Sequence, residues 1–371
     1  MFDKFFGLLS HDIGIDLGTS NTLVWVKGKG IVIREPSVVA IHKKTKKVIA
    51  IGSEAKKMVG KTPVTIQTVR PLRGGVIADF DATSSMISYY IQSIHEVGNI
   101  FPISWSRPKV VIGIPSAVTE VQRRAVWEAT LTAGAREAFL IEESMAAAIG
   151  EGISVFAPTG AMIVDIGGGT TEIAIISLGG IVVSKSLLCA GDEMDRAIMH
   201  YIRLRHGLLL GERTAEELKI KIGSAYEQKS KLKNEPIRPI RQAQDKQAQG
   251  ENGQLKNKDE KEILNSQLST INSQKDRVAV VRGRDIETGL PKSLRVTEVE
   301  VREALAPVLS EIIEGISDVL GDAPPELTSD ILEHGILLTG GGSLLPGIDK
   351  IIVERTHISV IKSEDPLTSV V

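Results

Sequence analysis

The chain is short of cysteine, net charge and long apolar runs, and each shortage excludes a class of protein. Its 371 residues include one cysteine, Cys189, which excludes an internal disulfide framework and a cysteine-rich zinc site. A net charge of −2 gives the chain no overall electrostatic footprint for nucleic acid. No apolar run approaches the ~18 residues of a membrane span, and the N-terminus lacks the features of a secretion signal. These absences predict a cytoplasmic protein.

The chain does contain a short pattern that occurs twice. Residues 15–22 read Ile-Asp-Leu-Gly-Thr-Ser-Asn-Thr, and residues 164–171 read Val-Asp-Ile-Gly-Gly-Gly-Thr-Thr. β-Branched runs flank both copies, so each predicts a strand, a Gly-rich turn and a second strand. Asp16 and Asp165 stand beside turns whose backbone N–H groups can cradle an anion, and a carboxylate there can hold the water shell of a divalent cation. The pair predicts a phosphate chain held from both sides with a metal ion between.

One copy alone could be an ordinary hairpin turn, but two matched copies with Asp in register favour the phosphate site. The pattern is not a Walker loop, because no Gly-Lys-Ser/Thr follows. It is not a dinucleotide fingerprint either, because the turn leads into a strand rather than a helix.

Hydrophobic periodicity and capping patterns predict most of the other elements. Strands are expected within 13–51 and at 109–115, 138–142, 292–296 and 335–339, and helices at 82–97, 119–133, 144–152, 191–204, 214–223 and 297–320. Capping boxes are expected at the start of three helices, formed by Thr119 with Gln122, Thr214 with Glu217, and Thr297 with Glu300. Mixed strands followed by helices occur twice, which implies an α/β protein of two similar halves facing each other across a cleft.

Residues 228–277 do not fit this pattern. The segment is rich in Gln, Lys, Asn, Glu and Ser and has no aromatic residue. It cannot bury enough apolar surface to offset its ordering entropy, so we expect a mostly disordered polar insertion. A partner-binding tail is the alternative.

Several segments resemble the actin-like ATPase superfamily of actin, sugar kinases, heat-shock chaperones and bacterial cytoskeletal proteins. Within it the chain is similar to the MreB family of bacterial actins that determine cell shape. The resemblance covers essentially the whole chain outside the insertion, and it is carried by residues 15–24, 27–32, 35–41, 75–80, 142–150, 191–195, 211–217, 338–343 and 364–368. Ser144 replaces a usual Pro, and the insertion replaces a short hairpin connection. The family continues for another helix beyond the position of Val371, so the resemblance implies a truncated C-terminus.

The resemblance implies an actin-like ATPase fold, with two similar α/β halves around a nucleotide cleft and a smaller subdomain in each half. The expected boundaries are an amphipathic membrane-binding segment at 1–10, a first half at 11–153 and a second half at 154–371. It also implies ATP with Mg²⁺ as ligands, with Asp16 and Asp165 holding the metal through water. Backbone N–H groups facing the β- and γ-phosphates would come from Gly18, Thr19, Ser20, Asn21, Gly167, Gly168, Gly169 and Thr170.

Glu143 occupies the position where the superfamily places a residue that orients the attacking water. Its neighbour Glu142 is the rival, and Thr170 is the second candidate for contact with the water. The alternatives are a solvated charge at a helix N-terminus, which the helix dipole favours, and a simple turn hydroxyl.

The nucleoside end is assigned to glycines whose missing side chains let the backbone approach a ligand. These positions are Gly340, Gly341, Gly342 and Ser343. The helix segment Glu216, Glu217, Leu218 and Lys219 resembles the ribose and adenine contacts, with a surface ion pair between Glu216 and Lys219 as the alternative. Gly191 and Asp192 are expected to close the cleft floor.

Two apolar segments suggest contact with a membrane surface. As a helix, residues 1–10 place Phe2, Phe5, Phe6 and Leu9 on one face. An expected loop at 99–106 carries Ile100, Phe101 and Trp105. A single segment would bind marginally, whereas a polymer carrying many would bind by avidity. Packing against the protein's own body is the alternative for both.

The implied function is an ATP-binding and hydrolysing cytoskeletal protein that polymerises into filaments at the inner face of the cell membrane. It would govern rod shape by organising peptidoglycan synthesis with membrane proteins of the elongation machinery, and its ATPase would be slow, Mg-dependent and coupled to polymerisation. A small-molecule kinase is one alternative, although no segment nominates its acceptor pocket. An ATP-binding scaffold without turnover is another.

Overall fold

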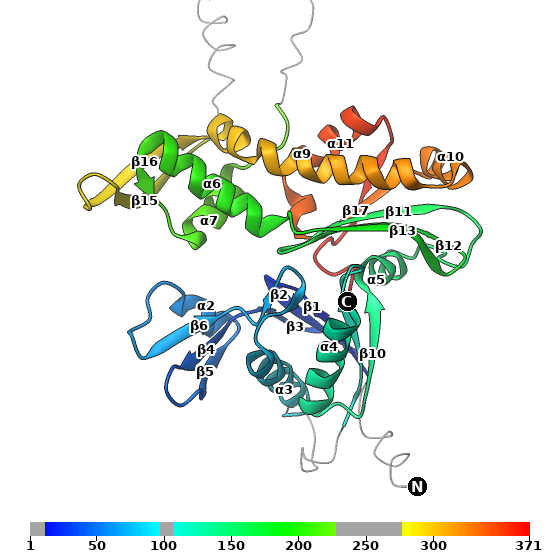
Figure 1. Ribbon diagram of the computed structural model, residues 1–371, viewed down its shortest axis with the longest axis horizontal. Coiled ribbons are helices and arrows are strands. Elements are labelled where there is room, and N and C mark those ends of the chain that lie inside the picture. Colours follow the sequence, from blue (N-terminus) through cyan, green and yellow to red (C-terminus); the bar gives the residue numbers. More distant parts are fainter. Residues whose placement is uncertain (1–11, 97–106, 228–276) are drawn as a thin grey trace, which may run out of the picture.

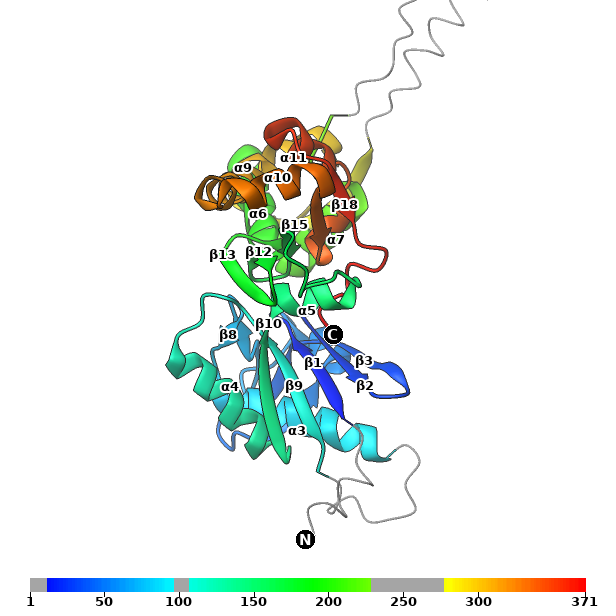
Figure 2. The same ribbon diagram turned by 90° about the vertical axis from the view of Figure 1, so that its right-hand side faces the viewer.

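The computed structural model describes residues 12–96, 107–227 and 277–371. Two halves lie one above the other in Figure 1, the first below and the second above, and Figure 2 shows them after a quarter turn. The predicted membrane segment 1–10, the loop residues Ile100, Phe101 and Trp105, and residues 228–276 of the predicted insertion lie outside the described residues. No helix among the described residues has the length and apolar composition needed to cross a bilayer.

The first half is built on a five-stranded sheet with the strand order β10-β9-β1-β2-β3. β1, β2 and β3 are antiparallel neighbours, whereas β9 and β10 continue the sheet in parallel. The bounds are β1 Ile13–Leu17, β2 Asn21–Val26, β3 Gly30–Pro36, β9 Lys109–Ile114 and β10 Glu137–Glu142. Helices α3 (Phe80–Glu96) and α4 (Glu120–Thr132) supply core residues that pack against this sheet.

The second half repeats the same plan with the order β13-β12-β11-β17-β18. Here β11, β12 and β13 are antiparallel, and β17 and β18 continue in parallel. The bounds are β11 Ala161–Ile166, β12 Thr171–Ser177, β13 Gly180–Leu187, β17 Ile336–Thr339 and β18 Val360–Lys362. The matched strand orders confirm the predicted α/β fold of two similar halves.

Helices cover the second sheet on both faces. Figure 1 shows α9 and α10 along its upper face and α5 between the two sheets. The bounds are α5 Glu143–Gly150, α6 Gly191–His206, α9 Glu298–Asp322, α10 Pro325–His334 and α11 Ile348–Thr356. Because α5 starts directly after β10, its first residue lies where the two halves meet.

A smaller group of elements is attached to each half. In the first half these are β4 Val39–His42, β5 Val48–Ile51, α2 Ser53–Met58, β6 Ile66–Val69, β7 Leu72–Arg73 and β8 Val76–Ile77. In the second half they are β14 Leu208–Leu209, α7 Glu212–Ile222, β15 Val278–Asp285 and β16 Pro291–Thr297. Both groups appear on the same side of the molecule in Figure 1.

The predicted capping boxes of α4 and α9 are confirmed, because Thr119 and Thr297 each exchange hydrogen bonds with the third residue of their helix. The box predicted at Thr214 is wrong. α7 begins two residues earlier, with Gly211 as its N-cap and no side-chain cap, so Thr214 lies inside the first turn. The short helices α2, α10 and α11 were not predicted.

Candidate functional site

The turns of the two repeated hairpins lie against each other where the halves meet. A Cβ added at Gly168 would collide with the side chain of Ser20, and one added at Gly169 would collide with the side chain of Thr19. Glycine fits at both positions because the Ser20 and Thr19 side chains occupy the space that a Cβ would need. The duplicated pattern therefore forms one joint structure.

The two predicted aspartates are held at equivalent places but have different neighbours. Asp16 pairs across its hairpin with Leu23, whereas Asp165 pairs with Glu172. Loss of water around half-buried Asp16 raises the pKa of its carboxyl to about 7. Burial, together with the charges of Asp16 and Glu172, raises the pKa of Asp165 to about 8. In this arrangement the neutral, protonated form of both carboxyl groups is favoured more than it is in water.

Glu143 joins the two aspartates from the start of α5. Burial, followed by the charges of Asp16, Glu172 and Asp165, raises the pKa of its carboxyl well above the usual range. Its rival Glu142 turns away and accepts a hydrogen bond from Arg123 at 2.7 Å. Glu143 is therefore the member of the adjacent pair that faces the two turns.

Glu172 is a buried member of this carboxylate group that the sequence reasoning missed. Its side chain is 1% exposed, and burial raises its pKa. It accepts hydrogen bonds from the backbone N–H of Ser116 at 3.0 Å and the hydroxyl of Ser186 at 2.5 Å. The available signal was an acid inside a strand, residues 171–177, that is otherwise uncharged and buried throughout.

The glycine turn after β17 packs against the end of β11. Gly340 has a φ of 80°, and a Cβ there would collide with the Asp165 carboxylate. A Cβ at Gly342 would collide with Ile166, and Ser343 donates its hydroxyl to the Gly340 carbonyl at 2.7 Å. The Ser343 hydroxyl is therefore bonded within the turn, and the Gly340 N–H donates to the Pro366 carbonyl at 3.0 Å.

The start of α6 connects the second turn to the first half. The N–H groups of Gly191 and Asp192 donate to the carbonyls of Gly167 (3.1 Å) and Gly168 (2.7 Å). The Asp192 carboxylate accepts from the Ser20 hydroxyl at 3.2 Å and from the Arg70 guanidinium at 2.8 Å. Asp192 thus ties the second turn to two points of the first half.

The predicted contacts on α7 divide between two environments. Glu216 forms an ion pair with Lys56 of the first half at 3.0 Å, and Lys219 pairs with Asp195 at 2.9 Å and donates to the Gly191 carbonyl at 2.7 Å. The alternative of a Glu216–Lys219 surface pair is therefore wrong. Their neighbours lie elsewhere, because Glu217 pairs with Arg213 on the exposed side and Leu218 is in the hydrophobic core.

A model of the MreB/Mbl protein family matches residues 10–278 and 253–371. The chain belongs to the MreB/Mbl family. It is 43% identical over 374 aligned residues to the cell shape-determining protein MreB of Escherichia coli strain K12, covering 100% of this chain and 94% of that protein. It is 40% identical over 363 residues to the cell shape-determining protein Mbl of Bacillus subtilis, covering 98% and 94%.

A solved structure within the MreB/Mbl family shares the fold. The crystal structure of MreB5 of Spiroplasma citri bound to ADP has a TM-score of 0.80 and 34% identity, covering 97% of this chain and 94% of that chain. The structure of the same protein bound to AMPPNP has a TM-score of 0.79. This likeness confirms the predicted actin-like fold.

The carboxylate group fits a hard divalent cation. The charged neighbours that raise the pKa values of Asp165 and Glu143 are all acids, and oxygen donors of this kind are the ligands that Mg²⁺ prefers. Among the described residues, no group of three His, Cys, Asp or Glu side chains is arranged to ligate one metal ion directly.

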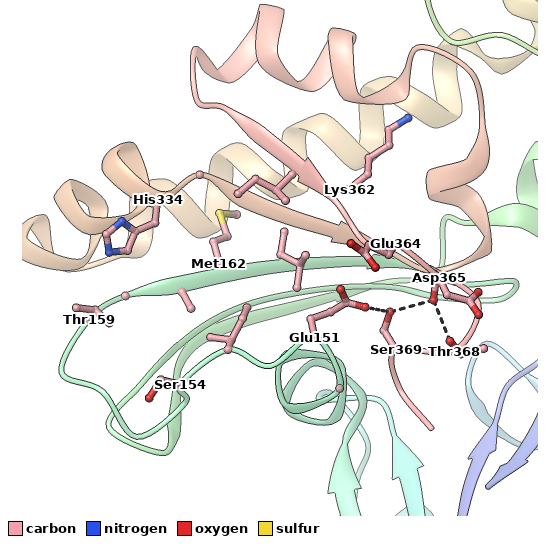
Figure 3. A pocket seen from close by; sticks show the side chains of 17 residues that line it. Glu151, Ser154, Thr159, Met162, His334, Lys362, Glu364, Asp365, Thr368 and Ser369 are labelled. Carbon is pink, nitrogen blue, oxygen red and sulfur yellow. Dashed lines mark hydrogen bonds between the residues drawn. The ribbon is translucent and has the colours of Figure 1, made fainter. Parts of the chain in front are cut away.

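A separate pocket of about 810 Å³ lies between the end of α5 and strands β17 and β18. Figure 3 shows its hydroxyl side chains bonded to the Glu151 carboxylate and to the backbone of Asp365. Ser369 donates to the Glu151 carboxylate at 2.5 Å, and Thr368 donates to the Asp365 carbonyl at 3.1 Å. The pocket shares no lining residue with the two hairpin turns.

Proposed function

We propose that this protein is an ATP-binding and ATP-hydrolysing bacterial actin that polymerises into filaments at the inner face of the cell membrane. The filaments would govern rod shape by organising peptidoglycan synthesis with membrane proteins of the elongation machinery. The observation that carries the proposal is the meeting of two Asp-fronted turns with Glu143 at the junction of two similar halves. The division into halves at 11–153 and 154–371 is part of this proposal.

Nucleotide binding is supported by the Spiroplasma relative, whose structures hold ADP and AMPPNP. In this chain the N–H groups of the two turns, Gly18 to Asn21 and Gly168 to Thr170, would face the phosphates. The Gly167 N–H, which the sequence pattern also assigned to this role, donates instead to the Thr170 carbonyl at 2.9 Å. Asp16 and Asp165 would hold Mg²⁺ through its waters. When bound, the ion would neutralise charge on the phosphate oxygens.

Hydrolysis is assigned to groups contributed by both halves. The Glu143 carboxylate from the first half would accept a hydrogen bond from the attacking water, and the Thr170 hydroxyl from the second half would hold the same water. Positioning of this kind, together with charge stabilisation, is the main contribution that proteins make to phosphoryl transfer.

The nucleoside would lie between α7 and the glycine turn after β17. Gly340, Gly341 and Gly342 would offer backbone, while Glu216 and Lys219 would contact the ribose and adenine. Gly191 and Asp192 would form the floor. Because Glu216 is paired with Lys56 in this structure, ribose binding would compete with that ion pair.

Membrane attachment is proposed from the sequence pattern alone. The apolar side chains Phe2, Phe5, Phe6 and Leu9, with Ile100, Phe101 and Trp105, would insert at the bilayer surface. Many copies along a filament would make the attachment stable. This accounts for a peripheral location in a chain with an ordinary soluble composition.

The experiment combines phosphate release and co-sedimentation in one sample of purified protein, with Mg·ATP and anionic lipid vesicles. We expect ATP turnover together with protein that pellets with the vesicles. Asp165→Ala should lose turnover, whereas Asp12→Ala, which alters an exposed ion pair with Lys27, should behave as the parent protein. A monomer that neither turns over ATP nor sediments under any condition would overturn the proposal.

A further inference from the structure

Glu172 is a buried carboxylate that is not among the residues proposed to contact the nucleotide. It lies on β12, directly opposite Asp165 in the hairpin, and it is 1% exposed. A buried carboxylate is costly unless its oxygens accept hydrogen bonds. Glu172 is satisfied by two donors, and these donors come from different halves of the molecule.

One donor belongs to the same half as Glu172 and the other does not. Ser186 lies on β13, the neighbouring strand of the second sheet, and donates its hydroxyl at 2.5 Å. Ser116 follows β9 of the first sheet and donates its backbone N–H at 3.0 Å. The Glu172 side chain is therefore a hydrogen-bonded bridge between the two halves.

The bridge ends beside both groups assigned to the attacking water. Ser116 follows Pro115, and a Cβ added at Gly75 would collide with Pro115 and lie 3.2 Å from Thr170 Cγ2. These distances place Pro115 and Thr170 close to the same point beside Gly75. The end of β9 therefore lies close to the Thr170 side chain.

The same strand also supports Glu143. A Cβ added at Gly113, within β9, would lie 3.4 Å from Glu143 Cγ. The Glu143 side chain thus rests on β9 a few residues before Ser116. The end of β9 and the Pro115 that follows it therefore lie near both Glu143 of the first half and Thr170 of the second.

We propose that Glu172 is a positioning residue: by holding the Ser116 N–H of the first half against β12, it sets the separation of Glu143 and Thr170. It touches neither nucleotide nor water and acts through the end of β9. The inference rests on the proposed ATPase function, because it names what aligns the two groups of that reaction.

Two substitutions at position 172 separate the effect of side-chain length from the effect of side-chain charge. Glu172→Gln keeps the length of the side chain, since its carbonyl oxygen can accept from Ser116 and its amide nitrogen can donate to Ser186. Glu172→Asp keeps the charge but is one methylene shorter, so it cannot hold both donors in place. A bridge requires the length, whereas a purely electrostatic role requires the charge.

The test measures kcat for phosphate release at saturating Mg·ATP, the Kd of a fluorescent ATP analogue and the thermal unfolding midpoint of each variant. We expect Glu172→Gln to stay within about threefold of the parent kcat, and Glu172→Asp to lose about 10- to 100-fold. The Kd should be unchanged in both. Glu128→Asp, which alters an exposed ion pair on α4, is the matched control and should keep the parent kcat.

Three results would overturn the inference: full activity in Glu172→Asp, loss of activity in Glu172→Gln with retention in Glu172→Asp, or a weakened Kd that accounts for the loss. If Glu172→Asp fails to fold, Ser116→Pro removes the same N–H donor with Glu172 intact and should show the same loss of kcat. Absence of turnover in the parent protein would instead count against the proposed function.

Discussion

The two hairpin turns share a pattern, yet the position opposite the aspartate differs between them. Asp16 faces Leu23 across the first hairpin, and Asp165 faces Glu172 across the second. The aspartate of the first hairpin therefore has an apolar residue opposite it, whereas the aspartate of the second hairpin has another acid opposite it. The comparison shows that the duplicated element keeps its Gly-rich turn and its aspartate in both halves, whereas the carboxylate opposite that aspartate is present in only the second hairpin.

The two hairpins also differ in how deeply their second strands, β2 and β12, are buried. β2 of the first hairpin contains exposed Asn21 and Trp25, whereas every residue of β12 is buried. The second hairpin is covered by α5 on one side and by α9 on the other. An acid at position 172 is therefore held in a fixed environment that the first hairpin does not provide.

The largest expected effect is a loss of ATP hydrolysis when either aspartate, Asp16 or Asp165, is replaced. If the two turns grip one phosphate chain, Asp16→Ala and Asp165→Ala should each lower kcat for ATP hydrolysis on the order of 100-fold. The double variant should cost little more, since groups that act as a unit are not additive. Steady-state phosphate release measures this, and an effect confined to one turn would show that the copies are not equivalent.

Copying the second hairpin's acid into the first should destabilise the protein. Leu23 is 6% exposed, and Leu23→Glu would bury a charge beside Asp16 without the donors that Glu172 has. We expect the free energy of unfolding to fall by about 3 kcal/mol or more. Urea unfolding measures it, with Leu23→Met as the control expected to cost less than about 1.5 kcal/mol. A stable Leu23→Glu protein would mean that the first hairpin also tolerates a second acid.

The raised pKa values predict how stability depends on pH in the nucleotide-free protein. Asp16 and Asp165 titrate near 3.8 when unfolded and at about 7 and about 8 when folded. The folded state therefore binds more protons between these limits, so the free energy of unfolding falls as pH rises towards 8. Thermal unfolding at pH 6 and pH 8 should show this fall, and Mg·ATP should reduce it by supplying positive charge. A protein equally stable at both pH values would contradict the raised pKa values.

The smallest effect is expected at the ion pairs that join the halves beyond the turns. Arg70 contacts Asp192 at 2.8 Å and Glu212 at 3.3 Å, and all three side chains are partly exposed. Arg70→Ala should speed release of a fluorescent nucleotide by up to about fivefold, since such pairs contribute up to about 1 kcal/mol. Arg124→Ala, which removes an ion pair within α4, is the control. Unchanged release would show that the Arg70 ion pairs do not help to hold the halves together around the nucleotide.

Features with local signals were predictable from the sequence. The Asp-fronted hairpins follow from β-branched runs around a Gly-rich turn, and the capping boxes at Thr119 and Thr297 follow from residue types three positions apart. The same rule failed at Thr214, because the chain enters α7 at Gly211 and the Thr214 N–H bonds to the Gly211 carbonyl instead. A capping pattern does not say which of several nearby residues begins the helix.

Contacts between the halves were beyond sequence reasoning. The Arg70–Asp192 and Lys56–Glu216 pairs join residues 122 and 160 positions apart, and their partners are set by how the halves dock. Glu172 is a different case, since an acid in a uniformly buried strand is a visible anomaly. The pairing with Ser116 that explains it required the three-dimensional structure.

Because Gly168 fits closely against Ser20 and Gly169 against Thr19, we expect the residues of the two turns to change together during evolution. A bulkier residue in one turn would clash with the facing turn, so it would require a smaller residue on the other side of the interface. Engineers who recombine halves from different relatives should therefore exchange both turns together. Chimaeras that mix them will fail by steric clash even when each half folds well by itself.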